Sequence, residues 1–126
     1  MRLHLLFPLL ALGLAACSST PPSITSFEVV RCNEPGSNKA VFTAQINGSF
    51  RQADIAFRDA NDAIIRKPDG SYDQYEHAFS NDVTTKSATV PAGAVKAELY
   101  VYPLQSGLSA LVASDQLDTF SAEGCK

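Results

Sequence analysis

Apolar and polar residues alternate along this chain in short segments from residue 24 onward. The clearest of these segments covers residues 94–102. Alternation with a period of two is typical of a β-strand that has one face in the core and the other toward solvent. The side chains predicted to point inward are Val95, Ala97, Leu99 and Val101, and those predicted to point outward are Lys96, Glu98, Tyr100 and Tyr102.

Five further segments carry enough of the same pattern to be interpreted as strands. Residues that favour turns separate them, such as the Asn47-Gly48 and Asp69-Gly70 pairs. In the first segment Phe27 and Val29 are expected on one face, and in the second Phe42 is expected inward. The five segments are residues 24–31, 40–46, 72–79, 83–90 and 108–120.

Residues 50–67 fit two structures. Their apolar residues recur at helical spacing, and Ser49 with Gln52 resembles the capping box of a helix N-terminus. The same residues also fit a hairpin of two strands. A helix would place Ile55 on its polar side and Asp54 on its apolar side, whereas strands create no such conflict. The hairpin is therefore the favoured prediction, with the helix as the alternative.

About seven short strands, with turn signals roughly every eight to twelve residues, are typical of a sandwich of two sheets. The pattern resembles that of immunoglobulin-like or fibronectin-III-like domains. We therefore predict an all-β chain, with a single immunoglobulin-like antiparallel β-sandwich over residues 24–126. The resemblance is one of architecture, because a chain without Trp lacks the Cys–Trp–Cys pattern of antibody domains.

The first 17 residues have the order of a secretory signal peptide. Arg2 precedes an apolar run over residues 5–14, and small residues follow before Cys17. The run is too short to cross a bilayer, which takes about 20 apolar residues. One interpretation is an ordinary cleaved signal, with Cys17 as an incidental thiol. The sequence Leu14-Ala15-Ala16-Cys17, however, resembles the lipobox of bacterial lipoproteins.

This resemblance implies that residues 1–16 are removed and that the Cys17 sulfur receives a diacylglyceryl group, often with a further acyl chain on the new amino terminus. Residues 17–23 then form the lipidated Cys and a Ser/Pro linker that reaches only about 20 Å. Asp after the Cys retains many Gram-negative lipoproteins at the inner membrane, so Ser18 favours the outer membrane. A cell-membrane anchor in a Gram-positive bacterium is the alternative.

Two further cysteines, Cys32 and Cys125, follow Cys17 in the exported part of the chain. Exported proteins fold in oxidising compartments, so we predict a disulfide between the two. In a sandwich the first and last strands can run in the same direction, which would bring both cysteines to one end of the domain. A bond that closes nearly the whole domain contributes about 4–5 kcal/mol in the chain-entropy model.

The charge pattern argues against a nucleic-acid partner. Without residues 1–16, the remaining 110 residues hold nine Lys and Arg against 13 Asp and Glu, a net charge of −4. The basic residues are scattered and form no cluster of the kind that nucleic-acid binding needs. A chain of this length suffices for one domain with its own core.

Catalysis and a resident metal or cofactor are not expected. His77 is the only histidine after residue 16, and no nucleophile motif accompanies it. Spaced Asp pairs are candidate Ca²⁺ ligands, but Asp is also common in turns, where it binds nearby backbone amides, and turns are the favoured interpretation. The pairs are Asp59/Asp62, Asp69/Asp73 and Asp115/Asp118.

The best candidate for an interface is a set of tyrosines. Tyr100 and Tyr102 share the outward face of the clearest strand, and Tyr72 and Tyr75 lie in a loop or edge strand. Exposed Tyr supplies a large contact area at low entropic cost. The predicted function is thus a membrane-anchored lipoprotein with a non-catalytic protein-interaction or structural domain. The alternatives are a lipoprotein that binds a glycan, a peptide or Ca²⁺, and then a small hydrolase.

Overall fold

Seven β-strands form the regular structure of the described residues, which are 21–32 and 37–117 in the computed structural model. These residues contain no helix. The strands are β1 (Ser23–Arg31), β2 (Lys39–Asn47), β3 (Phe50–Arg58), β4 (Gln74–Tyr75), β5 (Thr85–Thr89), β6 (Lys96–Pro103) and β7 (Leu111–Gln116).

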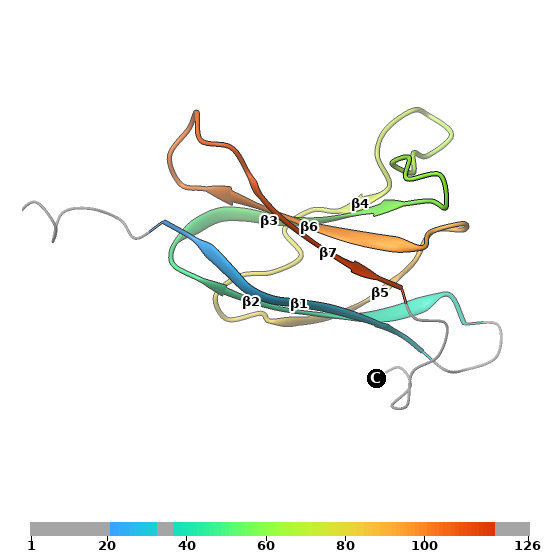
Figure 1. Cartoon of the computed structure of the whole chain (residues 1–126), viewed down its shortest axis with the longest axis horizontal. Helices are drawn as coiled ribbons and strands as arrows, with labels where there is room; N and C mark the ends of the chain where they lie inside the picture. Colours follow the sequence, from blue (N-terminus) through green and yellow to red (C-terminus); the bar gives the residue numbers. More distant parts are fainter. Residues whose placement is uncertain (1–20, 33–36, 118–126) are drawn as a thin grey trace, which may run out of the picture.

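The strands form two antiparallel sheets that pack face to face (Figure 1). One sheet has the order β1-β2-β5, and the other has the order β4-β3-β6-β7. The predicted all-β sandwich of about seven strands is therefore confirmed. Short β4 pairs with β3, through Ile55 opposite Tyr75. In immunoglobulin constant domains the fourth strand joins the sheet of the first two strands. Here β4 pairs with β3 instead, so one sheet has three strands and the other has four.

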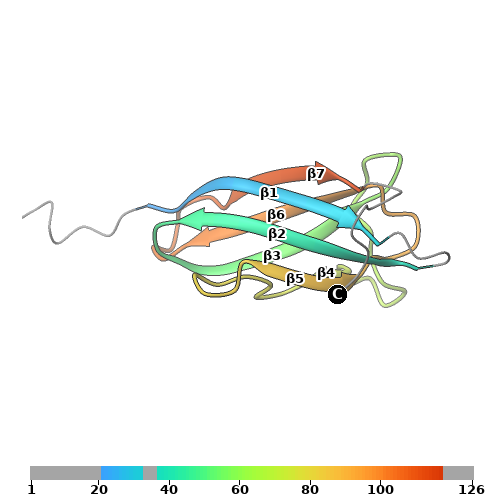
Figure 2. The ribbon, with the colours of Figure 1, turned by 90° about the horizontal axis from the view of Figure 1, so that it is seen from below.

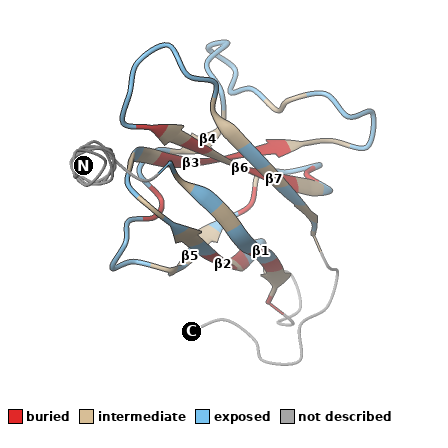
Figure 3. Ribbon diagram, turned by 60° about the vertical axis from the view of Figure 1, so that its left-hand side comes forward, coloured by how far each residue is buried: buried red, intermediate tan, exposed pale blue. Residues whose placement is uncertain are grey.

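The core lies between the inner faces of the two sheets (Figure 3). The predicted inward residues Ala97, Leu99 and Val101 are fully buried, as is Phe42 on the opposite sheet. Val95 is an exception, because its side chain is 40% exposed. It precedes the first residue of β6, and the alternation of faces holds only within the hydrogen-bonded strand. Buried Ala94 contributes to the core at this position instead.

Residues 50–58 form one continuous strand, so the helical alternative is wrong. Ala53–Phe57 are all buried, on both faces of β3. A strand that is covered on both sides loses the polar half of its alternation and can imitate helical spacing. The predicted return strand is reduced to isolated bridges, Arg58 with Ile64 and Arg66 with Tyr72.

The turn between β2 and β3 lies against the Pro21-Pro22 segment that precedes β1. Gly48 has a φ of +86°, and a Cβ added there would lie 2.6 Å from the carbonyl oxygen of Pro21 and 3.0 Å from the Cα of Pro22. The Pro21-Pro22 pair therefore packs directly on this turn. Only a residue without a side chain allows such close contact.

We expect Gly48→Ala to destabilise the domain more than Gly70→Ala does. Gly70 has a similar φ of +89° but no atom within 4 Å of an added Cβ, so its replacement isolates the backbone cost, about 1–2 kcal/mol. Gly48→Ala must in addition displace Pro21. Chemical unfolding of both variants measures the difference. Equal losses of unfolding free energy would show that Pro21 is not held against the turn.

Candidate functional site

Three of the four tyrosines meet on the outer face of the β4-β3-β6-β7 sheet. Tyr72, Tyr100 and Tyr102 surround a shallow depression of about 200 Å³. We call these three residues the tyrosine face. The depression is also lined by Ala56, Ile64 and Gln74.

Tyr100 and Tyr102 reach this face because Leu99 and Val101 alternate with them and fill the core. Tyr72 comes from the loop between β3 and β4. This loop folds back along the strand that precedes it, since the backbone N–H of Ile65 donates to the carbonyl of Phe57 at 3.0 Å. The loop thus adds the ring of Tyr72 to the two rings that β6 supplies.

Two arginines hold the outer rings of the tyrosine face. The Arg66 guanidinium carbon lies 4.0 Å from the centre of the Tyr72 ring, and Nη2 of Arg66 donates to the Tyr72 hydroxyl at 2.8 Å. Arg51 lies over Tyr102 at 5.2 Å, and its Nε donates to the carbonyl of Pro103 at 3.2 Å. Cation–π contacts of this kind restrict the rings before any partner arrives.

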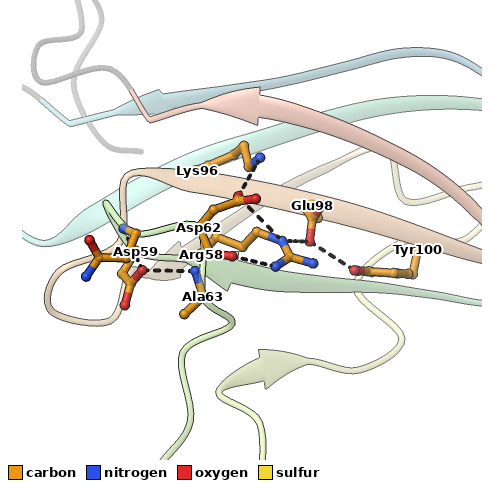
Figure 4. Close-up of polar contacts among 8 residues, drawn as sticks. Arg58, Asp59, Asp62, Ala63, Lys96, Glu98 and Tyr100 are labelled. Atoms are coloured by element: carbon orange, nitrogen blue, oxygen red, sulfur yellow. Dashed lines mark hydrogen bonds and ion pairs between the residues drawn. The ribbon is translucent and has the colours of Figure 1, made fainter.

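A buried carboxylate supports the third ring (Figure 4). Glu98 is only 9% exposed, although it lies on the predicted outward face. Its Oε1 accepts hydrogen bonds from Nε of Arg58 at 2.6 Å and from the Tyr100 hydroxyl at 2.9 Å. Burial raises the pKa of Tyr100, and the Glu98 carboxylate raises it further. The hydroxyl therefore remains a donor to Glu98 at neutral pH.

The Arg58 network continues to the turn that follows β3. Lys96 Nζ lies 3.0 Å from Asp62 Oδ1, and Arg58 Nε lies 4.0 Å from the same oxygen. The hydrogen bond and the charge of Lys96 lower the pKa of the Asp62 carboxyl. Asp59 Oδ1 accepts from the backbone N–H groups of Asn61 and Ala63, at 2.9 and 3.0 Å (Figure 4). This turn therefore anchors the loop that carries Tyr72.

Tyr75, the fourth predicted interface residue, is partly buried and packs against the core between the two sheets. Its ring centre lies 6.0 Å from that of Phe57 and 6.4 Å from that of Phe42, and its hydroxyl donates to the carbonyl of Thr89. Tyr75 thus joins β4 to β5 across the two sheets and is no part of the tyrosine face. Its odd spacing from Tyr72 is the signal that could have separated them, because residues three apart on an extended chain point to opposite faces.

Two of the remaining acidic candidates, Asp69 and Asp115, accept hydrogen bonds from nearby backbone groups. Asp69 Oδ1 accepts from the N–H of Ser71 at 2.9 Å and from its hydroxyl at 2.6 Å, as in an Asx turn. Asp115 Oδ2 accepts from the N–H of Val29 at 2.8 Å. Within residues 21–32 and 37–117, no group of three or more His, Cys, Asp or Glu is placed to hold a metal ion. Asp118 lies outside the described residues.

His77 is exposed and adopts a φ of 55°. Its backbone N–H donates to Asp54 Oδ1 at 3.0 Å, and Asp54 Oδ2 accepts from the Gln52 side chain at 2.7 Å. Asp54 is only 4% exposed, and the sequence analysis did not identify it as a buried carboxylate with a structural role. Its role is to fix the turn after β4, since a buried carboxylate requires hydrogen-bond donors.

The predicted disulfide meets its topological condition. The strands β1 and β7 point toward the same end of the sandwich (Figure 2), and the Val29–Asp115 hydrogen bond joins them near that end. Cys32 directly follows β1 and is 4% exposed. Cys125 and Cys17 lie outside the described residues, as do residues 1–16, so the disulfide, the lipidation and the signal peptide stay predictions. The described part of the chain holds no helix that is long and apolar enough to cross a membrane.

The tyrosine face and its arginines offer aromatic surfaces, hydroxyl groups and cations to a binding partner. Such groups suit recognition, because they combine apolar contact with directional hydrogen bonds. No family model, curated protein or solved structure matches this chain.

Proposed function

We propose that this protein is a lipid-anchored bacterial envelope protein that binds a protein partner through the tyrosine face, without catalysis. The anchor rests on the Leu14-Ala15-Ala16-Cys17 sequence. The observation that carries the interaction surface is the convergence of three tyrosines with Arg51 and Arg66 on one sheet face. Tyr and Arg are among the residues most enriched at the energetic centres of protein interfaces.

The shape of the face favours a protein over a small ligand. Its depression of about 200 Å³ and the hollow of about 610 Å³ that shares Tyr72 and Gln74 with it are both open to solvent, whereas small-molecule sites enclose most of the ligand surface. The rings are held before binding, by Arg66 on Tyr72, by Arg51 on Tyr102 and by Glu98 on Tyr100. A face ordered in advance loses little conformational entropy when it binds, which favours affinity.

Tyr72→Ala combined with Tyr102→Ala is expected to weaken partner binding by about thirtyfold or more, since a single hot-spot truncation costs about 2 kcal/mol or more. Tyr100 is left in place because its hydroxyl satisfies buried Glu98. The folded state should persist, because Tyr72 is 43% exposed and neither residue belongs to the core. Affinity capture from envelope extracts, followed by titration of the recovered protein, measures the effect.

The matched control is Glu28→Ala with Gln45→Ala. Both residues are exposed on the other sheet, so this double variant changes two side chains away from the tyrosine face. A partner that binds the wild type and the control equally but loses the tyrosine variant supports the proposal. Equal binding by all three proteins would contradict it. Loss of a bound glycan, with no protein lost, would favour the ligand-binding alternative.

A further inference from the structure

One end of the sandwich carries an open apolar hollow. The loop that joins β6 to β7 places Leu104 and Leu108 there, 50% and 56% exposed. They line a hollow of about 250 Å³ together with Pro21 and Pro22. We call these four residues the apolar pole. Figure 1 shows the loop at the same end as the start of β1. The other lining residues are Ser49, Pro103, Gln105, Ser109 and Leu111.

Exposure of two leucines beside two prolines leaves a contiguous apolar surface in water. Burial of the exposed half of each leucine side chain in apolar surroundings would be favourable. Neighbouring exposed apolar side chains of this kind commonly mark a contact with another molecule or a membrane. We therefore expect the apolar pole to contact an apolar surface.

The short segment between Cys17 and Pro21 indicates which apolar surface this is. Pro21 lines the hollow and is packed against Gly48, so the chain is held from this point onward. Only residues 18–20 separate Pro21 from Cys17. Four steps along a fully extended chain span at most about 14 Å. An acyl anchor on Cys17 would thus hold the apolar pole within that distance of the bilayer.

We propose that the apolar pole rests on the membrane and that Leu104 and Leu108 enter the boundary between lipid headgroups and acyl chains. This inference rests on the lipid anchor of the proposed function. Apolar side chains at such a boundary are buried by roughly 5–10 Å. Arg51, bonded to the carbonyl of Pro103 beside the loop, places a cation where lipid phosphates would lie.

This orientation leaves the rest of the domain free to bind. The strands run from the apolar pole to the opposite end of the sandwich (Figure 2). The depression of the tyrosine face lies along the side of the sheet, beside β3 and β6. A domain standing on its apolar pole therefore presents Tyr72 and Tyr100 to partners that lie beside it on the membrane.

The chain has no Trp, so a single introduced Trp reports on one position. The test uses the full lipidated protein with Leu108→Trp, in vesicles of phosphatidylethanolamine and phosphatidylglycerol with brominated acyl chains. We expect a blue-shifted emission that loses most of its intensity in the brominated vesicles. The control is Val95→Trp. Val95 is 40% exposed and precedes β6, whereas Leu108 follows β6, so the two residues lie beyond opposite ends of this strand. The Trp at position 95 should therefore emit as in water and keep its intensity.

Flotation with the vesicles separates this inference from the anchor on which it rests. Protein that does not float would overturn both. Floating protein with an unquenched Leu108→Trp would overturn the docking alone, whether its emission is blue-shifted by some other contact or not. Equal quenching of both Trp variants would also overturn it, because the apolar pole would then have no preference for the bilayer.

Discussion

Cys17→Ser is expected to release the protein from the membrane. Each buried methylene of an acyl chain contributes about 0.8 kcal/mol, so two or three chains anchor a protein stably. Serine offers no sulfur for the diacylglyceryl group. Leu104 and Leu108 cannot replace the anchor, because half of each side chain is already buried and the two together would contribute only about 1.5–3 kcal/mol, which is weaker than millimolar affinity. Fractionation and detergent partitioning of the variant measure the loss.

The adjacent change Ser18→Ala is the control, because it keeps the Cys17 sulfur. It should remain in the detergent phase and in the membrane fraction, while Cys17→Ser moves to the soluble fraction or keeps residues 1–16. Membrane retention of Cys17→Ser equal to that of the wild type, with residues 1–16 removed, would contradict the lipoprotein interpretation. The mass of the mature amino terminus provides an independent measurement.

Cys125→Ala is expected to lower the free energy of unfolding by about 4–5 kcal/mol, through loss of the predicted bond to Cys32. The disulfide would restrict the unfolded chain between the first strand and the end of the domain. A loss of this size is a large part of the total stability of a small domain, about 5–15 kcal/mol. Denaturant unfolding at neutral pH measures it.

The double variant Cys32→Ala with Cys125→Ala distinguishes a bond from simple packing. If the bond forms, removing Cys32 as well adds only the smaller packing loss of a side chain that is 4% exposed. If Cys32 only packs in the core, Cys125→Ala should be nearly as stable as the wild type. Alkylation of both thiols in the native protein would contradict the disulfide directly.

The proposed roles divide the sandwich by surface. In the proposed orientation the apolar pole would face the bilayer and the tyrosine face would lie along the side of the domain, while the core between the sheets provides the stability. Phe42 and Phe57 pack edge to face in this core, with ring centres 6.0 Å apart. Changes to the tyrosine face or to the apolar pole therefore leave the main cluster of buried side chains intact.

Local pattern was sufficient for most of the strands and for the sandwich, but not for the return strand predicted after residue 58. Alternation in residues 94–102 correctly predicted that Ala97, Leu99 and Val101 fill the core, because successive side chains of any strand point to opposite faces. The same rule correctly placed Tyr100 and Tyr102 on the outer face. It failed at Val95, which lies outside β6, and it could not exclude a helix for residues 50–67 on spacing alone.

Tertiary structure alone decided what covers each face. The alternation says that Glu98 points away from the core, but only the position of Arg58 on the neighbouring strand makes it a buried, paired carboxylate. The return path of the loop after β3 brings Tyr72 to Tyr100, and the pairing of β4 turns Tyr75 inward. The apolar pole likewise joins Pro21 to Leu108 across the length of the chain. A periodic pattern specifies the direction of a side chain from its own backbone, whereas its neighbours depend on segments that are distant in sequence.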